Sequence, residues 1–103
     1  MIYYGLDKYK NVIEISQDDS LSYFKDDKRR VADNTIECIT HYRVSTVFLV
    51  SDHSHSIGGR PILFETMIFD SNGSDMYCQR YSTWDEAVEG HKKAIEIAKS
   101  GKF

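Results

Sequence analysis

The chain of 103 residues contains 41% hydrophobic and 13% aromatic residues, a composition typical of a folded globular protein. A second core is excluded at this length, so we expect one domain that spans residues 1–103. The formal net charge of −3 argues against a nucleic-acid partner, because proteins that bind nucleic acid carry a basic surface. No apolar run approaches the roughly 20 residues that a membrane-spanning helix needs, so we expect no membrane partner.

The two cysteines, Cys38 and Cys78, form no CxxC pair, and the first residues lack the apolar stretch of a secretory signal. These features predict a cytoplasmic protein in which both thiols are reduced. The sequence indicates no cofactor, because it contains no phosphate-binding loop, HExxH or GxSxG motif.

The first predicted elements are a short strand at residues 11–16 and a short helix that follows it. β-branched side chains dominate the strand segment. Asp18 and Asp19 are good N-cap residues, and apolar side chains then recur at helical spacing to about Lys28. The basic run that begins at Lys28 directly follows two aspartates, whose negative charges largely cancel its positive charge. The segment is therefore interpreted as a solvated helix end rather than a nucleic-acid-binding patch.

The middle of the chain is typical of an antiparallel meander. The predicted strands span residues 31–39, 44–50, 62–69 and 76–82. Val44, Thr46, Phe48 and Val50 share one parity, which predicts a strand with one face in the core. Asn72 and Gly73 supply a hairpin turn signal between the last two strands.

The C-terminal helix is the best-specified element. Thr83 is a suitable N-cap, and Glu86 completes a capping box three residues later. The helix is expected to continue to about Lys99 and to stop before Gly101. Its apolar stripe consists of Trp84, Ala87, Val88, His91, Ala94, Ile95 and Ala98. The predicted fold class is therefore α+β: an antiparallel sheet of about four or five strands, packed against one C-terminal helix, with a short N-terminal helix.

A polar run, Asp52 to His55, lies where a strand gives way to a loop. Two histidines two residues apart can face one metal ion when the backbone is extended, with Asp52 and Glu65 as further ligands. The spacing matches no strong zinc motif, so we expect polar loop histidines and no bound metal.

Glu65 is the one charged residue in the run LFETM, so its carboxylate needs a cationic or hydrogen-bonding partner. The candidates are Arg80 on the next strand and His91 on the helix stripe. The set is either a buried network that holds the helix on the sheet or a functional pair in a pocket. Asp52, His53, Glu65, Arg80 and His91 form the candidate functional cluster.

A second set of candidates could bind a ligand. Gly58, Gly59 and Arg60 could cradle an anion with backbone N–H groups and a guanidinium, although a plain hairpin tip is the simpler interpretation. Trp84 could stack on a ligand, but a tryptophan at this position is more often a helix anchor.

Several runs, taken together, resemble a family of small uncharacterised proteins of bacteriophages and prophages. They include VSTVFL at residues 44–49, LFETM at 63–67 and RYSTW at 80–84, with further matches at residues 23–24, 29–32, 52–53, 61, 86–87 and 90–91. The resemblance spans residues 23–91 and implies a phage context rather than a mechanism. The loop that follows His53 departs from the family, which is richer there in glycine and proline, and this places a role of His55 in doubt.

Three functions compete on these grounds. The leading hypothesis is a non-catalytic phage accessory protein that binds a host protein or a small ligand, for instance to counter an antiviral defence in the host cytoplasm. The second is a small metal-assisted hydrolase that uses Asp52, His53, Glu65 and His91. The third is a structural or assembly protein.

The sequence also predicts a homodimer. Leu63, Met67 and Phe69 place apolar side chains on the sheet face that the C-terminal helix cannot cover. Leu21 and Phe24 of the N-terminal helix could cover only part of it. Two-fold self-association is the commonest way to bury such a patch.

Overall fold

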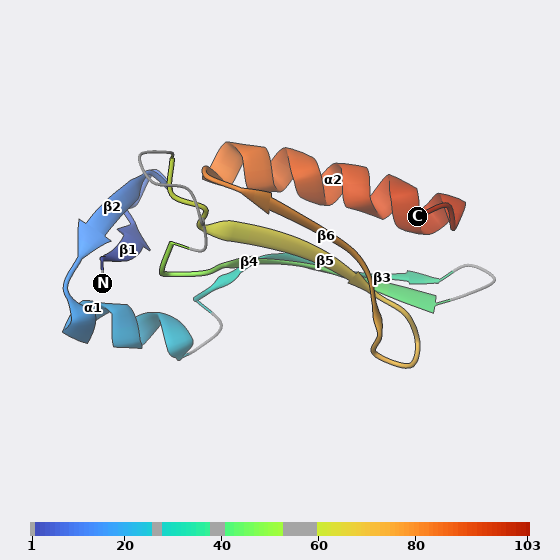
Figure 1. Cartoon of the computed structure of the whole chain (residues 1–103), viewed down its shortest axis with the longest axis horizontal. Coiled ribbons are helices and arrows are strands. Elements are labelled where there is room, and N and C mark those ends of the chain that lie inside the picture. The colour runs from blue at the N-terminus through green and yellow to red at the C-terminus, as the bar shows by residue number, and fades with distance from the viewer. Residues whose placement is uncertain (1, 26–27, 38–40, 53–59) are drawn as a thin grey trace.

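The protein is described by a computed structural model covering residues 2–25, 28–37, 41–52 and 60–103. Its elements are β1 (Tyr3–Leu6), β2 (Val12–Ile15), α1 (Gln17–Leu21), the short 3-10 helix η1 (Ser22–Phe24), β3 (Arg30–Glu37), β4 (His41–Phe48), β5 (Phe64–Phe69), β6 (Asp75–Tyr81) and α2 (Trp84–Ser100). The helix α2 lies along one face of a four-stranded sheet, and a β1–β2 hairpin with α1 lies at one end (Figure 1). The predicted α+β class is confirmed.

The sheet has the order β3-β4-β5-β6, and each neighbouring pair is antiparallel. Each strand therefore pairs with the next strand along the chain, as in the predicted meander. Within the described residues, β3 and β6 are its two edge strands.

The helix α2 begins and ends as its sequence predicts. The Thr83 side chain accepts a hydrogen bond from the Glu86 N–H, and Gly101 ends the helix with a left-handed φ of 67°. The buried residues of the helix are Ala87, Gly90, His91, Ala94 and Ala98. Small side chains on this face allow α2 to lie close to the sheet.

The core between α2 and the sheet has two apolar clusters. One contains Phe48, Val50, Leu63, Phe64 and Ala87, and the other contains Val44, Ile68, Ala94 and Ala98. Thr46, Thr66 and His91 lie at the intervening positions on their elements, and all three are buried. A polar row therefore crosses the middle of the core.

The N-terminal helix differs from its prediction. Ser16 is the N-cap, because its Oγ accepts a hydrogen bond from the Asp19 N–H at 3.1 Å, and α1 ends at Leu21 rather than near Lys28. The expectation that Leu21 and Phe24 could cover part of the second face of the sheet is wrong, since they are 56% and 60% exposed.

The strand β1 was not predicted from the sequence. It forms a hairpin with β2 and docks on the main sheet where the Tyr4 N–H donates to the Val50 carbonyl oxygen at 2.7 Å. Val50 lies beyond the end of β4 and has a φ of 72°, an unusual value for a β-branched residue. The predicted strand to residue 50 therefore ends two residues early, because the chain turns there to meet the hairpin.

Candidate functional site

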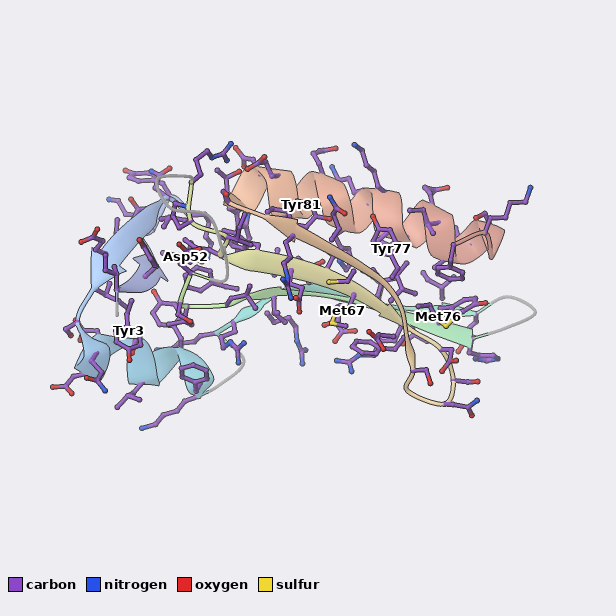
Figure 2. The ribbon with its side chains drawn as sticks, in the orientation of Figure 1. Tyr3, Asp52, Met67, Met76, Tyr77 and Tyr81 are labelled. Atoms are coloured by element: carbon purple, nitrogen blue, oxygen red, sulfur yellow. The ribbon has the colours of Figure 1, made fainter. Side chains whose placement is uncertain are left out.

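A groove of about 630 Å³ lies between the edge strand β6 and the helix α2. Its walls are formed by Tyr77, Gln79 and Tyr81 of β6 and by Asp85, Glu86, Glu89, Gly90 and Lys93 of α2. Figure 2 shows Tyr77 and Tyr81 between the strand and the helix. The register places these β6 residues on the helix side of the sheet, because Tyr81 pairs with Phe64 and Tyr77 with Ile68, both buried beneath α2.

The inner wall of the groove depends on a close approach between Tyr81 and Gly90. A Cβ atom at Gly90 would overlap the hydroxyl oxygen and Cζ of Tyr81, so only glycine fits beneath this ring. The Tyr81 hydroxyl is buried and forms no hydrogen bond of good geometry within the described residues. Burial raises the pKa of Tyr81, and the neighbouring Thr66 hydroxyl offsets part of that rise. The phenol is therefore neutral at ordinary pH.

The helix wall of the groove is mainly acidic, with three carboxylates and one ammonium group. The Thr83 hydroxyl lowers the pKa of Glu86, and Arg60, whose Nη2 lies 2.5 Å from Glu86 Oε1, lowers it further. Glu89 is exposed, and its Oε1 forms an i,i+3 ion pair with Lys92 Nζ at 3.2 Å. The groove thus presents the acidic side chains of Asp85, Glu86 and Glu89 to a molecule that enters it.

His91 does not line the groove but lies buried at the centre of the polar row. Its Nε2 is 2.7 Å from Asn34 Oδ1, and its Nδ1 is 2.6 Å from Thr46 Oγ1, which is in turn 2.6 Å from Thr66 Oγ1. An amide oxygen only accepts, so Nε2 carries the proton and Nδ1 accepts from Thr46. Burial lowers the pKa of His91, partly opposed by the charge of Asp33. The imidazole is neutral, and the row connects α2 with β3, β4 and β5.

Glu65 forms an ion pair with Arg80, as one of the two sequence-based alternatives predicted. Arg80 Nε lies 2.9 Å from Glu65 Oε2, and the Glu65 side chain is only 16% exposed. The same carboxylate accepts a weak hydrogen bond from the Cys78 thiol, at 3.7 Å. Burial raises the pKa of Cys78, and the Glu65 charge adds to the rise. The pair joins β5 to β6 on the sheet face opposite α2, so Glu65 and His91 do not share a site.

The remaining candidates lie apart. One Asp52 carboxylate oxygen accepts a hydrogen bond from the Ile62 N–H at 2.8 Å. His53, Gly58 and Gly59 lie outside the described residues. Arg60 forms an ion pair with Glu86 near the N-terminal end of α2.

Trp84 behaves mainly as an anchor of α2. It is partly buried and packs edge-on against Phe64, with ring centroids 6.3 Å apart. Lys10 Nζ lies over the Trp84 ring, 5.0 Å from the ring centroid, in a cation–π contact. Trp84 also lines a small pocket of about 250 Å³ beside the β1–β2 turn. These contacts tie the hairpin to the helix.

Within residues 2–25, 28–37, 41–52 and 60–103, no three His, Cys, Asp or Glu side chains gather in a way that could hold a metal ion. None of the helices described is long and apolar enough to cross a membrane.

Comparisons with family models, curated proteins and solved structures found no match to this chain. The resemblance to phage proteins therefore remains a prediction.

Sequence reasoning did not find the groove. Tyr77, Gln79 and Tyr81 have the ordinary alternation of a strand, and Glu89 has that of an exposed helix position. The available signal was Gly90, a glycine in the middle of a strong helix, which implies a close neighbour. The sequence does not indicate which ring would lie against it.

Proposed function

We propose that this chain is a non-catalytic binding protein that engages a protein partner through the groove between β6 and α2. The observation that carries the proposal is the combination of two tyrosines and a row of carboxylates along the walls of one 630 Å³ groove. Tyrosine is enriched at protein interfaces, because it offers a rigid apolar ring with a polar end.

The shape of the groove favours a peptide segment over a compact small molecule. Its strand wall extends from Tyr77 to Tyr81, about 13 Å at the rise of a strand. Its helix wall extends from Asp85 to Lys93, about 12 Å at the rise of an α-helix. Two walls of equal length suit an extended segment of about four residues.

The resemblance to phage proteins adds a context to this proposal. In that context the partner is a host protein in the cytoplasm, and binding would counter a host defence. The hydrolase alternative is weakened, because Glu65 and His91 lie on opposite faces of the sheet. The assembly alternative predicts a stable high-order oligomer.

The test is a comparison of two matched charge reversals. Glu89 and Glu96 are both exposed residues of α2, and each pairs with a lysine three residues later, but only Glu89 lines the groove. Affinity purification from host cells should recover a partner with the wild type and Glu96→Lys, and lose it with Glu89→Lys. Equal recovery with both variants would rule out the groove as the binding site.

A further inference from the structure

We propose that the partner segment adds to the outer edge of β6 as a further β-strand, with basic side chains directed toward α2. This proposal rests on the function proposed above and specifies how the groove is used. Strand addition to a sheet edge is a recurrent mode of peptide recognition, in which backbone hydrogen bonds supply affinity and alternate side chains supply specificity.

The backbone of β6 supports this mode. The Tyr81 carbonyl accepts from the Leu63 N–H at 3.0 Å, so the backbone groups of Tyr81 face β5. Backbone groups alternate in direction along a strand, which turns those of Arg80 and Cys78 away from the sheet. As β6 is an edge strand within the described residues, these N–H and C=O groups are a template for pairing.

The regular part of β6 has little to block such pairing. Edge strands are commonly protected by proline, by a bulge or by a covering element. β6 contains no proline. Its register shift lies at its start, between Asp75, the partner of Phe69, and Tyr77, the partner of Ile68. Residues 77–81, which form the groove wall, therefore keep a regular register.

The two edges of the sheet also differ in how α2 approaches them. At β3, the helix reaches the strand directly, because His91 hydrogen-bonds to Asn34. At β6, the Tyr81 ring contacts Gly90 of the helix, and the groove lies alongside this contact, between the strand and the exposed residues of the helix. A strand added beside β6 would have room on its helix side for every second side chain.

The charges of the two sides define the segment. Side chains on the helix side would meet Asp85, Glu86 and Glu89. Lys93 also lines this side, and exposed ion pairs link Glu86 to Arg60 and Glu89 to Lys92, so a basic partner would compete with cations that are weakly held. Side chains on the other side would continue the face that carries Cys78 and the Arg80–Glu65 pair. The complementary segment therefore alternates lysine or arginine with uncharged, β-branched residues.

The test is residue-resolved amide hydrogen exchange in β6, with synthetic hexapeptides as probes. With a peptide of alternating lysine and valine, exchange at the Cys78 and Arg80 amides should slow by about tenfold or more. The Gln79 and Tyr81 amides, which already face β5, should change little. A peptide of alternating glutamate and valine should give no such protection.

Backbone methylation of the probe provides the matched control. Two peptides are compared, one methylated at the backbone nitrogens of its lysines and one at the backbone nitrogens of its valines. The two sets of methyl groups point toward opposite edges of an added strand. One pattern should abolish the protection and the other should preserve it. Equal effects of the two patterns would overturn strand addition.

Three further results would also overturn it. The first is groove binding without protection at Cys78 and Arg80, which would leave the proposed function intact. The second is equal protection by the acidic peptide. The third is protection that rises with protein concentration in the absence of peptide, which would assign the edge to a second copy of the chain. Loss of the proposed function itself would appear separately, as equal recovery of partners by Glu89→Lys and Glu96→Lys.

Discussion

The ring of Tyr81 lies directly against the backbone of Gly90, with no room for a Cβ atom between them. This contact joins the end of β6 to the middle of α2 and forms the inner wall of the groove. Substitutions at either residue should therefore change both the stability of the protein and the shape of the groove.

We expect Gly90→Ala to destabilise the protein. Overpacking costs about 1 to 3 kcal/mol, and the gain in helix propensity offsets about 1 kcal/mol of that. In a Tyr81→Ala background the overlap is gone, so the same change at residue 90 should become neutral or stabilising. Urea denaturation of the four proteins measures this reversal, and additive effects would show that the two residues do not touch.

Trp84→Ala should lower the free energy of unfolding by about 3 kcal/mol, at the lower end for buried aromatic truncations because the ring is only partly buried. The loss arises from the contact with Phe64 and from the tie between α2 and the β1–β2 hairpin. Chemical denaturation provides the measurement. An unchanged midpoint would mean that the N-terminal end of α2 contributes nothing to the core.

Stability should depend on pH through His91. Burial lowers the pKa of the folded imidazole, so the unfolded chain binds a proton at higher pH than the folded one. The contribution of His91 to the free energy of unfolding is therefore complete above the pKa of the unfolded chain, about 6.5. As the pH falls below that value, this contribution is lost by up to about 1.4 kcal/mol per pH unit.

The matched variant for this prediction is His91→Gln, which does not titrate. Its free energy of unfolding should be lower than that of the wild type at pH 7.5, and the difference should narrow as the pH decreases from 6.5 to 5. The comparison removes the contributions of other groups, such as Asp33, whose pKa is lowered by Arg43. A constant difference across this range would contradict a neutral, buried imidazole.

We still expect a homodimer through the sheet face opposite α2. The expectation that Leu63 would belong to the uncovered patch is wrong, because Leu63 is fully buried in the core. The face carries Val47, Met67 and Phe69, all partly exposed, and Met67 and Met76 lie on the side away from the helix in Figure 2. Light scattering at micromolar concentration should give twice the chain mass of 11.9 kDa. The double variant Met67→Lys and Phe69→Lys should be monomeric, whereas Glu96→Lys should remain dimeric. A monomeric wild type would exclude the dimer.

The sequence predicted those elements whose patterns are periodic. The capping box and apolar stripe of α2 and the alternation of β4 placed the helix and the central sheet close to their observed positions. β1 was missed because Gly5 interrupts a run of only four residues, and its turn to β2 uses the Asp7 side chain rather than an Asn-Gly pair.

The candidate site was predicted only in part, for a geometric reason. The Glu65–Arg80 pair follows from strand neighbours, and a local register is enough to predict it. The partners of His91 are 45 and 57 residues away in the chain, and they depend on where α2 crosses the sheet. The groove depends on the same crossing, which no local pattern specifies.

The polar row formed by His91 and its partners has a consequence for the seating of α2. Two apolar clusters alone would tolerate a helix displaced along its axis, because apolar contacts are not directional. A shift of one turn, about 5.4 Å, would separate His91 from Asn34 and Thr46 and leave buried polar groups unpaired. The polar row therefore fixes the position of α2 along the sheet. Because the distance from α2 to β6 depends on that position, the width of the groove depends on hydrogen bonds that His91 makes to β3 and β4, away from the groove.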